Sequence, residues 1–223
     1  MSKESYTEYG PLTIGKKVYI YPGGRFCLPK EARIASDIGN NIETNNYSPC
    51  NPVIIGDNSI IGVDAVIYEG STLEESVILE DRVRIGYDCK IGSGSRLMYG
   101  AYICDRVKIG SSSRIAGFLC DAVTVGERST VMGNLVHSYV VPDLSWGEDE
   151  PAPLIGDDCV VGHSSVIVGG VRIGDNSYIT AGALVTKDVP KNTIVTGKNE
   201  HHSVSDWKGK GLTDLYARKE VER

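Results

Sequence analysis

A histidine stands immediately before a long irregular tract of the chain. The tract, MGNLVHSYVVPDLSWGEDEPAPLIGDD at residues 132–158, interrupts a six-residue pattern that holds on both sides of it. The pattern stops after His137 and resumes at Ile155. An imidazole with an ordinary pKa is well matched to taking a proton from an attacking hydroxyl or amine at neutral pH. His137 is therefore the first candidate for a catalytic base.

Other side chains of the same tract suit the same chemistry. Asn134, three residues before the histidine, either hydrogen-bonds an acceptor molecule or shapes a turn. Trp146 offers a platform for the acceptor, or it packs against the loop. An acidic residue could orient the imidazole or bind the acceptor. We assign Glu148 to the acceptor, although the sequence does not choose between it and its neighbours Asp149 and Glu150.

The elements that hold these side chains follow from the six-residue pattern. The 66 residues from 55 to 120 divide into eleven blocks of six, each opening with Ile or Leu. A period of six excludes an amphipathic helix, whose apolar residues recur every three or four positions. Three blocks make an 18-residue coil of triangular section, and each coil rises by about 4.8 Å. We therefore predict an all-β parallel solenoid in which residues 18 apart stack: Ile55, Leu73, Ile91 and Ile109 in one column, and Ile67, Ile85 and Ile103 in another.

The pattern has three breaks. The segment between residues 38 and 55 is predicted to be a turn-rich excursion or an irregular coil, and the segment between 115 and 125 a tightened corner. The third break is an excursion loop at 138–153, which should return to the corner it left, because His137 and Ile155 are 18 residues apart. His137 itself falls at the first position of a block, which elsewhere carries an inward Ile or Val. A fainter set of blocks opens at Ile14, Ile20, Phe26, Ala32 and Ile38.

The chain is thus divided into a solenoid domain at residues 1–200 and a tail at 201–223. Leu212, Leu215 and Tyr216 share one helical face, so a short helix is expected in the tail. That helix, together with Trp207, would cap the open end of the solenoid, as such folds require.

Composition excludes several classes of partner. The chain has 23 Lys and Arg against 29 Asp and Glu, a net charge of −6, which favours neither a nucleic acid nor an anionic membrane. No apolar run approaches 18 residues, and the polar start MSKESYTEYG does not resemble a signal peptide, so a cytoplasmic location is expected. The six cysteines are scattered without a C-x-x-C motif, which indicates reduced structural thiols and no metal site.

The repeated pattern [Ile/Leu/Val]-Gly-x-x-[small]-x resembles that of the hexapeptide-repeat acyltransferases over about residues 12–197. That family folds as a left-handed parallel β-helix. The tract from residue 133 to 199 is similar to the catalytic half of the family members that acetylate maltose, galactosides, xenobiotics and sugar nucleotides. Residues 153–156, PLIG, match the motif that follows the excursion in the family. TAGALVTKDVP at residues 180–190 matches its closing motif.

The resemblance implies a reaction and a cofactor site. It implies acyl transfer from acetyl-CoA or another acyl-CoA, without a metal, to a sugar, nucleotide sugar or amino acid, with His137 as base. It also implies a homotrimer with active sites between subunits, and Trp146 as a platform for pantetheine. The CoA contacts carried over from the family are His163, Ala181, Thr186 and Lys187, with Lys191 and Lys198 as further cations for the phosphates.

Two other functions remain open at this point. A γ-type carbonic anhydrase uses the same solenoid but needs three histidine ligands; Val168 occupies the position that would partner His163, and two of the four histidines lie in the tail. A noncatalytic trimeric scaffold is the other alternative. The coils around EESVILEDRVRIGYDCKIG resemble the solenoid domains of sugar nucleotidylyltransferases, so a separate enzyme could be its partner. A noncatalytic scaffold does not need His137, so that residue distinguishes an enzyme from a scaffold.

Overall fold

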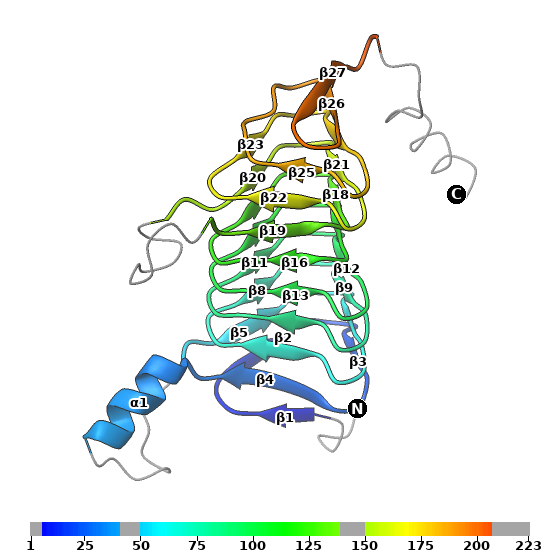
Figure 1. Ribbon diagram of the computed structural model, residues 1–223. Helices are drawn as coiled ribbons and strands as arrows, with labels where there is room; N and C mark the ends of the chain where they lie inside the picture. Colours follow the sequence, from blue (N-terminus) through cyan, green and yellow to red (C-terminus); the bar gives the residue numbers. More distant parts are fainter. Residues whose placement is uncertain (1–5, 41–49, 139–149, 207–223) are drawn as a thin grey trace.

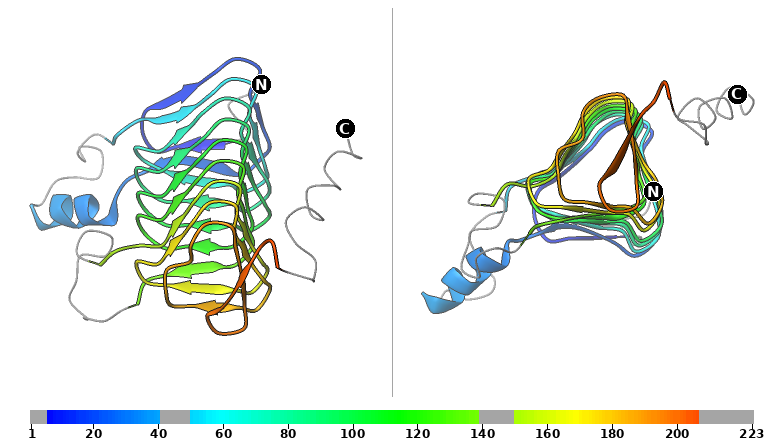
Figure 2. Two further views of the ribbon diagram at one scale, coloured as in Figure 1. Left: turned by 90° about the horizontal axis from the view of Figure 1, so that it is seen from above. Right: turned by 45° about the horizontal axis from the view of Figure 1, so that its top comes forward.

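The chain folds as a solenoid of triangular section. The computed structural model describes residues 6–40, 50–138 and 150–206. Short strands stack into three parallel sheets that form the three faces of a prism (Figures 1 and 2). Across the near face in Figure 1 the chain runs from right to left while successive coils rise, which is the left-handed sense. The predicted left-handed parallel β-helix is confirmed.

Each face is one sheet. Face A contains β1 (Tyr6–Glu8), β4 (Gly24–Leu28), β7 (Val66–Tyr68), β10 (Arg84–Ile85), β13 (Tyr102–Ile103), β16 (Phe118–Leu119), β19 (Asn134–Val136), β22 (Val166–Val168) and β25 (Leu184–Val185). Face B contains β2 (Leu12–Ile14), β5 (Val53–Ile55), β8 (Thr72–Leu73), β11 (Lys90–Ile91), β14 (Lys108–Ile109), β17 (Thr124–Val125), β20 (Leu154–Ile155) and β23 (Arg172–Ile173). Face C contains β3 (Tyr19–Ile20), β6 (Ile60–Ile61), β9 (Ile78–Leu79), β12 (Arg96–Leu97), β15 (Arg114–Ile115), β18 (Thr130–Val131), β21 (Val160–Val161), β24 (Tyr178–Ile179), β26 (Thr193–Thr196) and β27 (Glu200–Ser203). The chain passes from A to B to C, so the prism has an A–B, a B–C and a C–A corner.

The core is a set of aliphatic columns along the prism axis. Both predicted columns are confirmed by the strand register: Ile55, Leu73, Ile91 and Ile109 on face B, and Ile67, Ile85 and Ile103 on face A. These side chains are at most 3% exposed. Because successive strand residues point to opposite sides of a sheet, one aliphatic residue per strand is enough to fill the interior.

The glycine that follows many of the aliphatic residues is explained by the coil above it. At Gly86, a Cβ atom would overlap the carboxylate of Asp105, which accepts the backbone N–H of Tyr87 at 3.0 Å. The arrangement recurs at Gly156, under the carboxylate of Asp175, which accepts the N–H of Asp157 at 2.9 Å. The turn aspartate of one coil thus satisfies a backbone donor of the coil below, and glycine makes room for it.

The faint repeat does not continue through Ala32 and Ile38. The structure places a helix there, α1 (Glu31–Gly39), which stands outside the solenoid at the A–B corner (Figure 1). The predicted coil positions at these two residues are therefore wrong. An alanine is too small to fill an inward position of the core, and the run EARIA is rich in residues with high helix propensity. The helix begins directly after Pro29-Lys30.

A buried glutamate anchors the segment that contains α1. Glu69, fully buried at the corner after β7, accepts the backbone N–H of Lys30 at 2.7 Å and that of Asn51 at 2.8 Å. Its carboxylate also pairs with the Arg33 guanidinium of α1 at 2.5 Å. The two ends of the excursion and the helix between them are thus held by one side chain of the solenoid.

The C-terminal end differs from the expected helical tail. Residues 200–203 form β27, which pairs antiparallel with β26 and extends face C. The segment on which the helix was expected, residues 207–223 with Trp207, lies outside the described residues. Among the residues that the structure describes, no helix is long and apolar enough to span a membrane.

Candidate functional site

His137 lies at the A–B corner, not in an inward column. The inward position of its coil belongs to Leu135, which pairs with Leu119 of the coil below and Ile167 of the coil above. The prediction that the imidazole replaces an inward aliphatic side chain is therefore wrong. His137 is nevertheless only 2% exposed.

The tightened corner expected between residues 115 and 125 is present, and a second one, which was not predicted, explains this shift. Inward residues Ile115 and Leu119 are four positions apart, separated by Gly117 at the C–A corner, and Val131 and Leu135 repeat the pattern around Gly133. A Cβ at Gly117 would overlap the carbonyl oxygen of Gly133, so the corner closes only with glycine. Each tight corner removes two residues from a coil and changes the phase of everything that follows.

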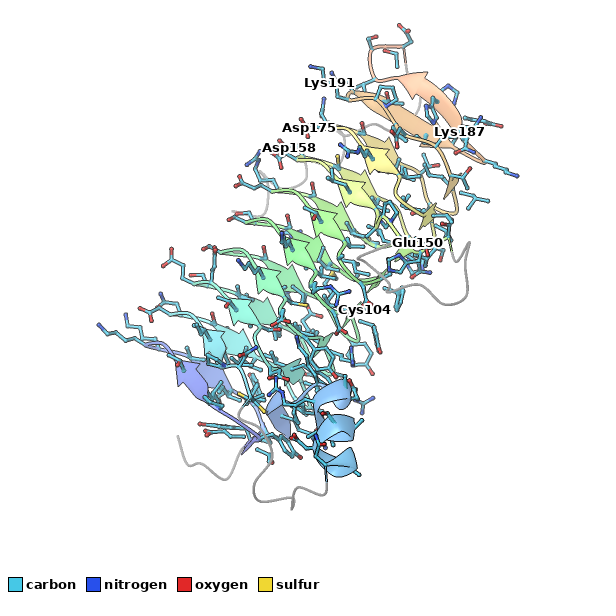
Figure 3. The ribbon with its side chains drawn as sticks, turned by 90° about the vertical axis from the view of Figure 1, so that its left-hand side faces the viewer. Cys104, Glu150, Asp158, Asp175, Lys187 and Lys191 are labelled. Atoms are coloured by element: carbon cyan, nitrogen blue, oxygen red, sulfur yellow. The ribbon has the colours of Figure 1, made fainter. Side chains whose placement is uncertain are left out.

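The excursion after His137 is closed by a carboxylate at its root. Ser138 donates its backbone N–H to Glu150 Oε1 at 2.5 Å, and its hydroxyl donates to the same oxygen. Glu150 is 5% exposed and lies at the A–B corner (Figure 3). Of the three acidic candidates, Glu150 is thus placed one residue from His137. Trp146, Glu148 and Asp149 lie outside the described residues.

A cleft of about 470 Å³ opens above the root of the excursion. Its glycines let two backbones pass closely: Gly169 adopts φ +74°, and a Cβ at Gly170 would lie 2.5 Å from the Cβ of Pro151. The lining residues are Ser138, Val168, Gly169, Gly170, Val171, Thr186, Lys187 and Asp188. The cleft therefore places the predicted cofactor residues Thr186 and Lys187 beside Ser138, the residue that follows His137.

The C-terminal hairpin of β26 and β27 steadies this side of the cleft. Asn199 accepts the backbone N–H of Thr186 at 2.8 Å and donates its amide to the Thr186 hydroxyl at 2.9 Å. Lys198 forms a parallel bridge with Leu184 of β25, the strand that ends just before Thr186. The structure thus brings three of the six predicted cofactor residues together: Thr186, Lys187 and Lys198.

The remaining predicted residues lie elsewhere on the prism. His163 and Ala181 are at the C–A corner on adjacent coils, where Gly182 donates its N–H to the His163 carbonyl at 3.0 Å. Asn134 is exposed on face A, and its side-chain oxygen accepts the N–H of Phe118 at 3.4 Å. Lys191 is at the B–C corner. Figure 3 shows it on the opposite edge of face B from Lys187.

A second cleft lies beside Lys191 and is lined by a cation that the sequence reasoning missed, Arg172. It has a volume of about 450 Å³, and its lining includes Arg172, Asp188 and Lys191. Asp188 also lines the first cleft and accepts the N–H of Arg172 at 2.8 Å. The two clefts share Asp188, and we call their combined lining, from Ser138 to Lys191, the track across face B. Arg172 was detectable in principle, since it is the residue before an inward isoleucine and so points outward.

The groups below the site are acidic and thiol side chains of the same corner. Burial raises the pKa of Asp105 to about 6, and the neighbouring carboxylate of Asp121 raises it further, whereas Arg84 and Arg106 oppose the shift. Burial also raises the pKa values of the Cys104 and Cys120 thiols to about 12. Both thiols are therefore protonated at neutral pH and unsuited to act as nucleophiles.

Two family models match the chain. One, described as the bacterial transferase hexapeptide with six repeats, matches residues 152–187. The other, described as the hexapeptide repeat of succinyl-transferase, matches residues 52–81 and 82–115. Residues 52–115 and 152–187 thus carry hexapeptide repeats. The matched segments cover solenoid coils on both sides of the His137 excursion.

Curated hexapeptide-repeat relatives match short stretches of the chain. The bifunctional protein GlmU of Syntrophotalea carbinolica is 39% identical over 62 residues, which are 28% of this chain and 13% of that protein. The putative acetyltransferase YvoF of Bacillus subtilis is 40% identical over 63 residues, which are 28% of this chain and 34% of that protein. The chain thus matches 34% or less of the length of these relatives.

Solved structures match over nearly the whole chain at low identity. The UDP-N-acetylglucosamine acyltransferase from Campylobacter jejuni covers 97% of this chain and 82% of its own length, at 13% identity and a TM-score of 0.46. The corresponding enzyme of Francisella novicida covers 95% and 73%, at 15% identity and a TM-score of 0.45. Neither likeness bears on the reaction of this chain.

Proposed function

We propose that this hexapeptide-repeat protein is a CoA-dependent acyltransferase, with an acetyl thioester as donor and a small polar acceptor. The observation that carries the proposal is the A–B corner, where a buried histidine lies next to a cleft that is lined by Thr186 and Lys187. The relative named a putative acetyltransferase supports the same class of reaction. A sugar, a nucleotide sugar or an amino acid supplies the hydroxyl or amine.

His137 acts as the general base in this mechanism. The acceptor oxygen or nitrogen attacks the thioester carbonyl carbon while the imidazole takes the acceptor proton. A backbone N–H at the corner stabilises the oxyanion of the tetrahedral intermediate. The carbon–sulfur bond then breaks, and the imidazolium returns the proton to the departing thiolate. Glu150 binds Ser138 at the start of the excursion and so sets the position of His137, the residue before it.

The track across face B is assigned to the cofactor. Pantetheine lies in the cleft beside Ser138, and the phosphates lie near Lys187, Arg172 and Lys191, whose positive charges suit them. His163 and Ala181 are at a different corner of the same chain. They reach this cofactor only from a neighbouring copy, which supports the proposal of a homotrimer with sites between subunits.

The decisive experiment measures thiol release from acetyl-CoA against a panel of sugars, nucleotide sugars and amines. We expect His137→Ala to lower the rate by about 10²- to 10⁴-fold, the usual contribution of a general base. His201→Ala, at an exposed histidine of β27, is the matched control and should behave like the wild type. Unchanged turnover in His137→Ala would remove the histidine from the mechanism. Absence of turnover with every acceptor would favour the noncatalytic scaffold.

A further inference from the structure

Three exposed tyrosines lie on face C and at the adjoining C–A corner of the N-terminal coils, away from the candidate active site. Tyr19, Tyr21 and Tyr99 are 54%, 43% and 59% exposed. Tyr19 and Tyr21 pack edge to face with ring centroids 4.9 Å apart. Aromatic residues make up only 7% of the chain, so a cluster of exposed rings is a distinctive surface feature.

Two of these tyrosines border a cleft of about 520 Å³. Its lining includes Gly62, where a Cβ would overlap the backbone of Glu80 in the next coil. Tyr21 follows β3 and Tyr99 follows β12, so they are three strand spacings apart, about 14 Å along the prism axis. The other lining residues are Ile60, Val63, Ile78, Leu79, Glu80, Asp81 and Arg96.

The polar groups of this cleft are held in place by contacts with one another. Arg96 donates its Nε–H to Glu80 Oε1 at 2.7 Å, and Tyr99 donates its backbone N–H to Glu80 Oε2 at 2.9 Å. Arg82 donates to the Tyr99 hydroxyl at 3.0 Å, and its guanidinium carbon lies 5.9 Å from the ring centroid. The ring, the carboxylate and the guanidinium are thus ordered before any ligand arrives, which lowers the entropic cost of binding.

The chemistry of the cleft matches a sugar chain. A pyranose ring has apolar C–H faces, which suit tyrosine rings and the exposed Ile60, and a rim of hydroxyls. A carboxylate accepts from one hydroxyl and a guanidinium donates to its neighbour, as the Glu80–Arg96 pair allows. Arg82 and Arg96 are balanced by Glu80 and Asp81, so the cleft has no excess positive charge for a phosphate. We propose that this cleft binds an oligosaccharide chain of several pyranose units laid along the prism axis.

This binding site is independent of the acyl transfer proposed above. The cleft lies at the C–A corner, whereas His137 lies at the A–B corner on a later coil. The sugar-binding experiment therefore has its own outcome, whether or not the thiol-release assay detects turnover.

The test is binding of the wild-type protein to a microbial glycan array, followed by titration calorimetry with the free oligosaccharides maltohexaose, cellohexaose and chitohexaose. We expect one sugar class to bind, and we expect Tyr21→Ala and Tyr99→Ala each to weaken it about tenfold. Tyr9→Ala is the control, since Tyr9 is 52% exposed but lies at the A–B corner. Arg96→Ala should also weaken binding, and Arg114→Ala, the next residue in the same column of face C, should not.

Several results would overturn the proposal. The first is the absence of binding to any glycan by a folded wild-type protein. The second is equal affinity of the tyrosine variants and the Tyr9→Ala control at unchanged melting temperature. The third is a fall in molecular mass of Tyr21→Ala or Tyr99→Ala in light scattering, which would identify the cleft as a contact between copies of the chain.

Discussion

Two segments leave the solenoid at the same A–B corner, and each is closed by a buried glutamate (Figures 1 and 2). The segment with α1 is anchored by Glu69, which belongs to the solenoid and accepts donors from both ends of the excursion and from Arg33. The segment after His137 is closed by Glu150, which belongs to the excursion itself and accepts both donors of Ser138. The first excursion is thus held by a residue of the solenoid, whereas the second is held by a contact between two of its own residues.

This difference separates a structural role from a functional one. A helix fixed from the solenoid side is part of the rigid scaffold, and its anchor Glu69 is engaged by donors of that segment. A loop closed on its own exit keeps its root in one place, next to a histidine and below a cleft. Loops that are held at the root by a rigid scaffold are where catalytic groups commonly lie.

Removing the scaffold anchor should have the largest effect on stability. Glu69→Ala leaves two backbone N–H groups and the Arg33 guanidinium without the buried carboxylate that accepts them, so we expect a loss of about 3 kcal/mol in the free energy of unfolding. Urea unfolding at fixed protein concentration measures it. Glu75→Ala, at an exposed glutamate of the neighbouring corner, is the control. Thiol-release activity of the folded Glu69→Ala protein should stay at the wild-type value, and a large loss would contradict the separation of roles.

Removing the second anchor should act mainly on turnover. Glu150→Ala frees the two ends of the excursion and displaces the neighbouring His137, and a displacement of about 1 Å can lower a rate about 10²-fold. The unfolding free energy should fall by less than in Glu69→Ala, because both donors lost belong to one residue, Ser138. Steady-state thiol release with wild-type and variant proteins measures the effect. A variant with normal turnover and low stability would make the two glutamates equivalent.

The cations of the track across face B should influence the donor and not the stability. Lys187→Ala and Arg172→Ala each remove a positive charge near the proposed phosphate positions, so we expect the KM for acetyl-CoA to rise about fivefold with little change in kcat. Lys108→Ala, at an exposed lysine of an earlier strand on face B, is the matched control. An equal effect of all three substitutions would indicate general electrostatic attraction and not a defined site.

The corner between the two excursions should make stability depend on pH. The pKa of Asp105 is raised to about 6 from an ordinary value of 3.8, so the folded state holds its proton more tightly than the unfolded state. Stability from this group is therefore present at pH 4 and is lost as the pH rises toward 6. Asp105→Asn retains an acceptor for the Tyr87 N–H but not the charge. We expect a gain of about 1 kcal/mol at pH 7, allowing for partial exposure.

Thermal unfolding of wild type and Asp105→Asn at pH 5 and pH 7 tests this pH dependence. The difference between the two proteins should be larger at pH 7 than at pH 5. A difference that is the same at both pH values would show that the substitution acts through packing and not through the charge. Asp175→Asn is the control, because Asp175 accepts a backbone N–H in the same way at another corner.

The order of residues along the chain determined the solenoid, the aliphatic columns and the choice of His137 as a candidate catalytic residue. An inward aliphatic residue at a fixed interval is a local pattern, and the stacking of Ile67 on Ile85 follows from counting. Counting in sixes did not predict the helix α1, because the apolar residues Ala32 and Ile38 fit a weak six-residue repeat and also occur in the helix. Short-range patterns cannot distinguish them without knowing which side chains the core admits.

The position of the histidine and the composition of its site were decided by tertiary structure. The tight corner at Gly133 shifts the phase of the repeat by two residues, so counting in sixes from Val131 places His137 in the core whereas the strand register places it at the corner. The partnership of Ser138 with Glu150 spans 12 residues and depends on where the excursion returns. The sequence thus determines which residues repeat and which stand apart, because strand spacing is the same in every coil. Only the folded prism decides which of the exceptional residues meet, because that depends on the corners and on contacts between distant coils.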